Sequence, residues 1–333
     1  MSGDREWGGP LAAFLAARRA TREDLLTAVG EPFGRPLLVM ATGSILAGFG
    51  NGRSDIDINV VVEHHAPRLP IPSHELPVLV DATYFGRSVV EAWVSAIRDQ
   101  PWPPAGPLDR AQWLQHRANI FNCTRFACGL TLVEEDDWDF RIAEFREPWL
   151  RERVAEWWRI ESVRRGRAAR WLADARPLLA SQLKLEAVLA ALEGRAAAAG
   201  QIYFKQKWLA EKLRTIEDKE GMAVWREVMR APTNEREAGD YLVRCEDILV
   251  ELGANQADGL TAQLWYLPGV KLRALDERTL VSRWDLRGIE FGGVIAAVPE
   301  PPQPIWEGSL DEPPPADVLS LFVEDMTWLA IVA

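Results

Sequence analysis

Two apolar runs joined by a glycine-rich connection constrain the fold of this 333-residue chain more than any other feature. The first run, Leu37–Ala41, leads into Gly43-Ser44, which is typical of a buried strand that ends in a tight turn. The second run, Asp55–Val62, follows a segment with glycine at 48, 50 and 52. A third run, Val78–Phe85, ends at a glycine, so the sequence predicts neighbouring strands near the N-terminus.

The second of these strands begins with two carboxylates, Asp55 and Asp57, in the pattern Asp-Ile-Asp-Ile. Because side chains alternate between the faces of a strand, both acids share one face while the isoleucines point into the core. Carboxylates held side by side repel each other unless a cation lies between them, and Mg²⁺ prefers such hard oxygen ligands. An exposed polar strand face is the alternative interpretation of the same pattern.

The pair Gly43-Ser44 favours the metal interpretation. Small residues directly after a strand let the backbone approach an anion and present N–H groups to it. A helix that started there would add a favourable partial charge for phosphate. The alternative is an ordinary glycine-rich turn without a ligand.

Gly43-Ser44, ten residues and then Asp-x-Asp form a spaced pattern, with Arg53-Ser54 directly ahead of the first acid. This pattern resembles the signature of the DNA polymerase beta-like nucleotidyltransferase superfamily, especially its minimal bacterial members and the antibiotic nucleotidyltransferases. In that family a third carboxylate comes from a later strand, which Asp81 matches. A buried Asp81 could instead pair with Arg87 or with a backbone N–H.

The resemblance implies transfer of a nucleoside monophosphate with two Mg²⁺ ions, and it implies that Asp55, Asp57 and Asp81 hold them. In such sites the ions lie roughly 3.5–4 Å apart and stabilise the attacking and leaving oxygens. The same resemblance implies that Gly43, Ser44 and Arg53 bind the nucleoside triphosphate.

A basic segment further along the chain, Tyr203–Leu209, contains Lys205 and Lys207. In related enzymes a lysine from the helical domain reaches the β- and γ-phosphates, which makes both residues candidates. The two lysines do not share a helical face, so we expect only one of them to act. Lysines that face solvent beside a core Trp208 are the alternative.

The chain divides by pattern into three parts. Residues 1–139 are expected to form an α/β (α+β) nucleotidyltransferase domain with a mixed sheet. Residues 140–254 have apolar side chains at three- and four-residue spacing, which predicts a helical domain. Residues 255–333 contain short strand-like runs and proline-rich stretches, which predicts a small C-terminal α+β region.

Charge and apolar content exclude some classes of function. The net charge is −11, which argues against binding a long nucleic acid, although residues 151–240 carry 18 basic against 14 acidic side chains and could meet a compact anion. No apolar run approaches the length of a membrane span, and the N-terminus lacks the apolar core of a signal peptide. Cys123, Cys128 and Cys245 have no metal or redox spacing, which favours reduced thiols and a cytoplasmic location.

Other side chains of chemical interest are weaker candidates. His64, His65 and His74 lie in a proline-rich stretch without the spacing of zinc ligands. The acidic run Glu134–Asp137 is best interpreted as a solvated loop. The 15 tryptophans are expected mainly in the core, although one or two could stack on a base or an acceptor ring.

The sequence therefore predicts a magnesium-dependent nucleotidyltransferase that transfers a nucleoside monophosphate to a small-molecule acceptor. AMP, supplied by ATP, is the first candidate for the transferred group. The alternatives are transfer to a protein or RNA acceptor and an inactive module that senses nucleotide.

Overall fold

The structure is a computed structural model that describes residues 9–51, 53–64, 70–73, 79–135, 138–254, 256–284, 287–292 and 302–333. The chain forms two compact units, which are described separately. Unit 1 consists of Met1–Gln100, Ala118–Val154 and Gly200–Glu211. Unit 2 consists of Pro101–Arg117, Ala155–Ala199 and Lys212–Ala333. A search of the described residues finds no helix with the length and apolar character needed to span a membrane.

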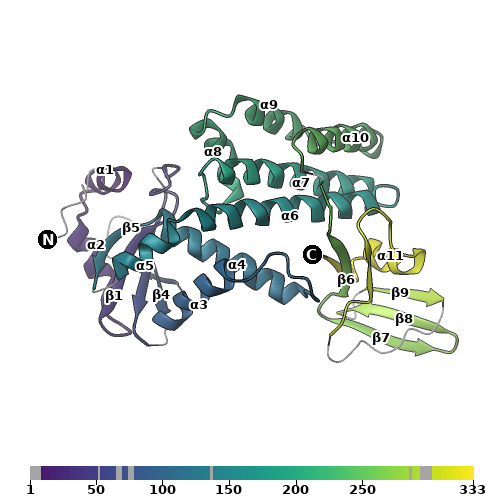
Figure 1. Cartoon of the computed structure of the whole chain (residues 1–333), viewed down its shortest axis with the longest axis horizontal. Coiled ribbons are helices and arrows are strands. Elements are labelled where there is room, and N and C mark those ends of the chain that lie inside the picture. Colours follow the sequence, from purple (N-terminus) through teal and green to yellow (C-terminus); the bar gives the residue numbers. More distant parts are fainter. Residues whose placement is uncertain are drawn as a thin grey trace. The chain divides into compact units, whose positions relative to one another are not determined.

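Unit 1 contains a sheet with helices on both faces (Figure 1). Its elements are α1 (Pro10–Ala16), α2 (Arg22–Val29), β1 (Pro36–Thr42), β2 (Ile56–Val62), β3 (Pro70–Ser73), β4 (Val80–Gly86), α3 (Arg87–Arg98), β5 (Leu130–Glu134), α5 (Trp138–Phe145) and the 3₁₀ turn η1 (Gln206–Trp208). Three further helices have residues in both units: α4 (Arg110–Cys128), α6 (Pro148–Leu172) and α8 (Leu209–Thr215).

Over the described residues, the strands of unit 1 form a five-stranded sheet in the order β3-β4-β2-β1-β5. Strands β2 and β4 are parallel, while the other neighbouring pairs are antiparallel. The sheet is therefore mixed, which confirms the predicted α+β class of this part of the chain.

Helices α1 and α2 cover one face of this sheet. Their buried leucines and valine pack against alternate residues of the central strands in one apolar cluster: Leu11, Leu15, Leu25, Val29, Val39, Ala41, Ile56, Ile58, Val60, Val80, Ala82 and Tyr84. The start of α2 is fixed by a capping box, since the Thr21 hydroxyl accepts from Asp24 N–H and the Asp24 carboxylate accepts from Thr21 N–H.

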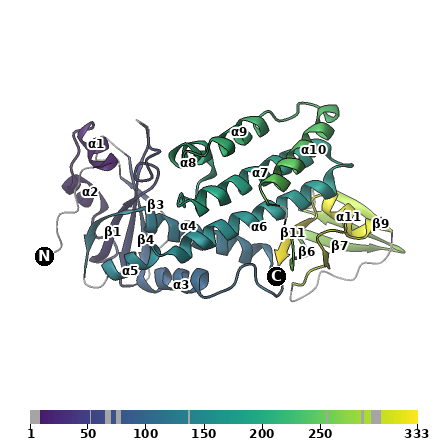
Figure 2. The same cartoon turned by 45° about the horizontal axis from the view of Figure 1, so that its top comes forward.

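Helices α3, α4 and α5 supply aromatic side chains to the opposite face. Phe85 of β4 packs edge-on against Trp93 of α3, with ring centroids 4.9 Å apart. The ring centroid of Phe126 in α4 lies 6.1 Å from that of Trp93 and 5.3 Å from that of Phe145 in α5. Figure 2 shows α3 and α5 beside β4. The residues of β1, β2 and β4 that alternate with the α1/α2 cluster therefore belong to this aromatic face.

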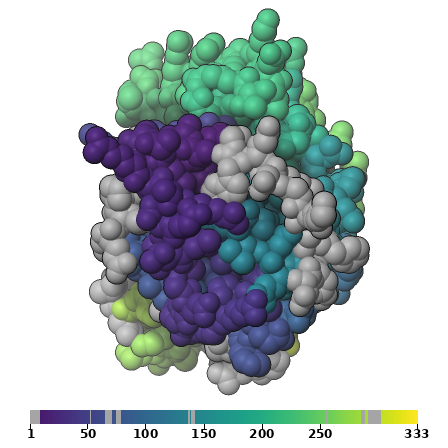
Figure 3. Space-filling model, turned by 90° about the vertical axis from the view of Figure 1, so that its left-hand side faces the viewer, coloured from purple at the N-terminus to yellow at the C-terminus, as the bar shows by residue number. Residues whose placement is uncertain are grey.

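The N-terminal side of unit 1 is viewed in Figure 3, where residues from the first part of the chain, drawn in purple, make up much of the surface. In α1 and α2, the side chains of Leu11 and Leu25 are buried against the sheet. These short helices act as a cover for the sheet.

Unit 2 contains a group of packed helices and two small sheets. Its further elements are α7 (Pro177–Ala198), α9 (Lys219–Val228), α10 (Glu235–Glu251), β6 (Thr261–Tyr266), β7 (Val270–Leu275), β8 (Arg278–Arg283), β9 (Arg287–Gly292), β10 (Trp306–Ser309), α11 (Ala316–Val323) and β11 (Thr327–Val332). Figures 1 and 2 show α7 alongside α6 and α10. Gly194 of α7 lies against α6, where a Cβ would be in van der Waals contact with Ala155 O at 3.5 Å.

The C-terminal strands form two three-stranded sheets over the described residues, β10-β6-β11 and β7-β8-β9. Val281, Leu321 and Met326 join strand β8 to the segment around α11 in a small apolar cluster. Helix α11 also contacts α6, because Trp171 packs edge-on against Phe322 with centroids 5.6 Å apart.

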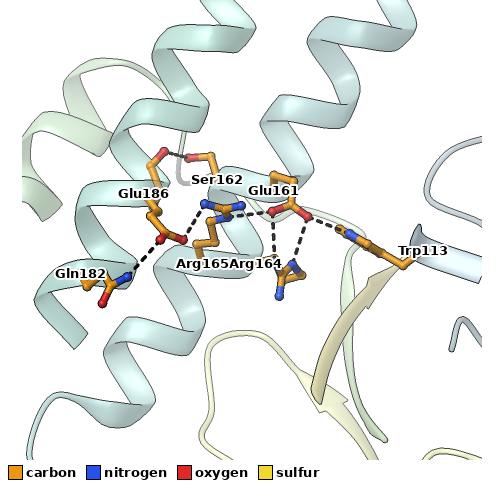
Figure 4. A network of polar contacts seen from close by, with 8 residues as sticks. Trp113, Glu161, Ser162, Arg164, Arg165, Gln182 and Glu186 are labelled. Atoms are coloured by element: carbon orange, nitrogen blue, oxygen red, sulfur yellow. Dashed lines mark hydrogen bonds and ion pairs between the residues drawn. The ribbon is translucent and has the colours of Figure 1, made fainter. Parts of the chain in front are cut away.

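A buried carboxylate connects several elements of unit 2 (Figure 4). Glu161 of α6 accepts hydrogen bonds from Trp113 Nε1 at 2.8 Å, from Arg165 Nε at 2.7 Å and from Arg164 Nη2 at 3.1 Å. Arg165 Nη1 also donates a hydrogen bond to Glu186 Oε2 of α7 at 2.6 Å. Burial raises the pKa of Glu161, but the two arginines outweigh it and lower that pKa to about 2. The network keeps a buried charge ionised and joins α4, α6 and α7.

Candidate functional site

Asp57 of β2 and Asp81 of β4 are direct partners in the parallel register of these strands. Directly opposed residues of neighbouring strands point to the same face, so both carboxyl groups lie on one side of the sheet. The neighbouring residues Ile56, Ile58 and Val80 belong to the α1/α2 cluster. The two acids therefore lie on the aromatic face, at the end where β2 and β4 begin.

Asp55 directly precedes β2 and is exposed, whereas Asp57 and Asp81 are half-buried. Burial is the largest influence on Asp57 and raises the pKa of its carboxyl. Arg125 and Lys205 lower this pKa, while Asp55 and Asp81 raise it, and the net shift is upward. The three predicted acids are thus close enough to repel each other's charge.

The turn after β1 meets Asp57 directly. Gly43 has φ +91, a left-handed conformation that favours glycine. A Cβ at this position would collide with Asp57 Oδ2. Thr42, the last residue of β1, donates a hydrogen bond from Oγ1 to Asp57 O of β2 at 3.3 Å. The absence of a side chain at Gly43 therefore leaves room for the Asp57 carboxylate.

Residues after Gly43 form a turn and not a helix. Ala47 N–H donates to Gly43 O at 3.2 Å, and Phe49 N–H donates to Ser44 O at 2.8 Å. The favourable dipole of a helix N-terminus, which the sequence allowed here, is consequently missing. Any anion at Ser44 would be held by turn N–H groups and side chains.

Arg53 lies in a second turn, directly before the acids. Its N–H donates to Asn51 Oδ1 at 2.9 Å, and Asn51 N–H donates to Ser54 Oγ at 2.9 Å. Arg53 is exposed. The turn fixes the backbone ahead of Asp55 while leaving the guanidinium in solvent.

Arg125 of α4 is a member of the site that sequence reasoning missed. Its Nη2 lies 3.3 Å from Asp57 Oδ1 and donates to Thr42 Oγ1 at 3.0 Å. The Arg125 side chain is 12% exposed. A half-buried cation therefore neutralises part of the charge of the acids.

The segment 203–205 brings two further groups to the acids. Burial and the Asp57 carboxylate raise the pKa of Tyr203 to about 12, so its phenol keeps its proton at neutral pH. Lys205 Nζ lies 4.4 Å from the ring centroid of Phe121, and the Arg125 guanidinium lies 5.7 Å from the same ring. Phe121 thus makes cation–π contacts with both Lys205 and Arg125, which lie near the acids.

The two candidate lysines differ in their surroundings. The positive charge of Lys205 lowers the pKa of Asp57. Lys207 Nζ instead lies 5.4 Å from the ring centroid of Trp208. Both are exposed. The structure brings Lys205, and not Lys207, toward the acids.

Aromatic rings join this segment to the glycine-rich connection. Phe49 lies 6.0 Å from Tyr203 and stacks on Trp208 with centroids 5.8 Å apart. Phe49 and Tyr203 are buried. The contacts fix the position of the 203–208 segment relative to the turn that follows β1.

The weaker candidates lie apart from these groups or outside the described residues. His64 is exposed after β2, while His65, His74, Asp136 and Asp137 lie outside the described residues. Glu135 pairs with Arg35. Arg87, an alternative partner for Asp81, forms ion pairs with Glu63 and Glu91.

In the described part of the chain, no group of three or more His, Cys, Asp and Glu side chains is arranged to hold a metal ion. Within the part of the chain that the structure describes, Cys123, Cys128 and Cys245 form no disulfide bond.

No protein-family model and no curated protein matches this chain. Among solved structures, it is similar to a nucleotidyltransferase-like protein from Exiguobacterium sibiricum, with 13% sequence identity and a TM-score of 0.32. The match covers 66% of this chain and 70% of that chain. A likeness this distant supports no conclusion about activity.

Proposed function

We propose that this protein is a nucleotidyltransferase that uses Mg²⁺ to transfer a nucleoside monophosphate from a nucleoside triphosphate to a small-molecule acceptor. ATP is the first candidate for the donor. The observation that carries this proposal is the pairing of Asp57 with Asp81 on one face of the sheet, with Asp55 two residues before Asp57. Three acids near one another on strand ends supply the oxygen ligands that Mg²⁺ prefers.

The residues fit a divalent cation in their chemistry. Burial and two neighbouring carboxylates disfavour the charged form of Asp57, and a bound cation offsets that cost. Gly43, without a side chain, lets the Asp57 carboxylate lie directly against the turn after β1. Asp55, Asp57 and Asp81 would hold the metal, which when bound neutralises charge that develops on the phosphate oxygens.

The cations of the site suit the triphosphate. Lys205 and Arg125 lie beside the acids on the Phe121 ring and would bind phosphate oxygens, Arg125 through its forked donors. Gly43, Ser44 and Arg53 would contribute turn N–H groups and a further positive charge. Phosphoryl transfer needs mainly such positioning and charge.

Asp81 would accept the proton of the attacking hydroxyl or amine of the acceptor. The acceptor oxygen or nitrogen bonds to the α-phosphorus, the bond to the bridging oxygen breaks, and pyrophosphate leaves. Tyr203, protonated at neutral pH, would donate to an anionic oxygen beside Asp57.

The test is pyrophosphate release from each of the four ribonucleoside triphosphates with Mg²⁺, measured against a panel of small alcohols, acids and amines. Asp57→Asn is expected to abolish release, whereas Asp240→Asn, at an exposed position of α10, is expected to retain it. Full turnover by Asp57→Asn would exclude the proposal. A mass gain of one nucleotide on co-incubated protein or RNA would assign a macromolecular acceptor instead.

A second candidate is a module that binds nucleotide without turnover. It is favoured by the observation that no metal-holding group of side chains forms among the described residues, and that Arg125 already pairs with Asp57. Calorimetric binding of ATP, with no pyrophosphate from any acceptor tested, would support this candidate over the enzyme.

A further inference from the structure

Unit 2 contains a small cavity between α6, α7 and α10 that the proposed reaction does not use. Its volume is about 20 Å³, room for one or two water-sized groups. The polar and charged side chains that line it are Ser162, Arg167 and Arg170 of α6, Lys184 of α7 and Glu246 of α10. Gly166, also on α6, contributes no side chain to the wall.

Positive charge exceeds negative charge around this cavity. Glu246 is the acidic lining residue, and it pairs with both Lys184 and Arg170. Arg167 pairs outside the cavity with Asp311, whose side chain is 79% exposed and therefore screened by solvent. Three cations thus line the cavity with one carboxylate, and a second carboxylate, Asp311, pairs with Arg167 from outside the lining.

Arg167 has a donor that lacks a partner. The residue is only 8% exposed, its Nη2 donates to Asp311 Oδ1 at 3.0 Å, and its buried Nη1 has no hydrogen-bond partner in the described part of the chain. A buried guanidinium nitrogen without an acceptor costs free energy, which an anion in the cavity would recover.

Burial is the largest influence on the pKa of both Arg167 and Lys184. Burial, with Arg170 nearby, lowers the pKa of Arg167. Burial also lowers the pKa of Lys184, although Glu246 acts in the opposite direction. Ser162 Oγ donates to Ala187 O at 2.9 Å and offers the cavity no further proton.

We propose that this cavity binds one small monatomic anion, chloride under cellular conditions, between Arg167, Arg170 and Lys184. A volume of about 20 Å³ is on the order of that of one monatomic anion, whereas a whole phosphate group would extend beyond it. The bound anion would join α6 to α7 and α10 and stabilise the helical part of unit 2.

The experiment uses the full chain in chloride or gluconate at equal ionic strength. Chloride is expected to raise the thermal midpoint of the wild type by about 2–4 °C relative to gluconate. Arg167→Met is expected to abolish this rise. Arg236→Met, which removes the same charge from an exposed position of α10, is expected to keep it.

A second variant tests the cavity without changing its charge. A Cβ at Gly166 would lie 3.8 Å from Leu249 Cδ1 and 4.0 Å from Ala187 Cβ, so alanine fits without a clash. Gly166→Ala is expected to fold and to lose the response to chloride, because the methyl group occupies part of the cavity.

Crystals grown with bromide give the direct observation. The proposal expects an anomalous peak between Arg167 and Lys184 in the wild type and none in Gly166→Ala. An equal response to chloride in wild type and Arg167→Met, or a wild-type cavity without a bromide peak, would overturn it. A response to phosphate alone would also overturn it, since the assigned ion is monatomic.

Discussion

Arg125 Nη2 lies 3.3 Å from Asp57 Oδ1, which joins a cation of α4 to one of the two half-buried acids. Burial and the carboxylates of Asp55 and Asp81 disfavour a charge on Asp57, and Arg125 is the largest influence in the opposite direction. The ion pair therefore favours the charged form of Asp57 at an acid-rich strand end, and the proposed function also gives this guanidinium a role in binding triphosphate.

Arg125→Met is expected to reduce magnesium-dependent pyrophosphate release by about 10²-fold, the usual cost of removing a group that stabilises developing charge. Arg117→Met is the matched control, because Arg117 is an exposed residue of the same helix. Steady-state rates at saturating nucleotide make the comparison. Equal rates for the two variants would exclude Arg125 from the reaction.

Gly43 and Gly48 allow the effect of backbone strain to be distinguished from the effect of a steric clash with Asp57. Gly43 has φ +91 and Gly48 has φ +81, so alanine costs about 1–2 kcal/mol of strain at either position. A Cβ at Gly43 collides with Asp57, whereas a Cβ at Gly48 meets nothing within 4 Å. Gly43→Ala is therefore expected to lose pyrophosphate release and Gly48→Ala to retain it, measured on folded protein. Similar activities in both variants would contradict the role given to Gly43.

The two candidate lysines make a second matched pair. Lys205 faces the acids through Phe121, while Lys207 contacts Trp208. Lys205→Ala is expected to weaken binding of the triphosphate about tenfold, the loss of one charge-assisted contact. Lys207→Ala is expected to change it less than twofold. Calorimetric titration with a non-hydrolysable nucleotide measures both, and a larger loss in Lys207→Ala would reverse the assignment.

Glu161 gives unit 2 a specific acid sensitivity. Its folded-state pKa is about 2, below the ordinary value of 4.5, so the unfolded chain binds this proton first. The stabilisation is complete above pH 4.5 and is lost as the pH falls from 4.5 to 2, by about 3 kcal/mol.

Glu161→Gln is therefore expected to unfold at lower urea concentration than the wild type at pH 7, with a smaller difference near pH 3. Glu152→Gln, at an exposed position of α6, is the control and should follow the wild type. If Glu161→Gln differs from the wild type by the same amount at both pH values, the buried carboxylate does not carry the acid sensitivity.

Local pattern predicts much of unit 1. The runs Leu37–Ala41, Asp55–Val62 and Val78–Phe85 correspond to β1, β2 and β4, because buried strands need unbroken apolar side chains. Strand β3 has prolines at 70 and 72 and lies at the sheet edge, where proline is tolerated, so its pattern did not indicate a strand. The division into 1–139, 140–254 and 255–333 stays a prediction.

Strand alternation and the family resemblance point to the three acids and to Lys205, but not to every group that lies beside Asp57. Alternation in a strand places Asp55 and Asp57 together, and the register adds Asp81. Arg125 and Tyr203 come from distant segments, and their local patterns resemble those of ordinary helix and loop residues. Only tertiary structure brings them to the acids. The roles of all these residues remain proposals.

Binding of Mn²⁺ in the presence of a non-hydrolysable nucleotide, followed by electron paramagnetic resonance, tests the central claim most directly. We expect the wild type to bind Mn²⁺ and expect Asp81→Asn and Asp57→Asn to bind it at least tenfold more weakly, with Asp240→Asn unchanged. Equal affinity in all four proteins would show that the paired acids of β2 and β4 hold no metal.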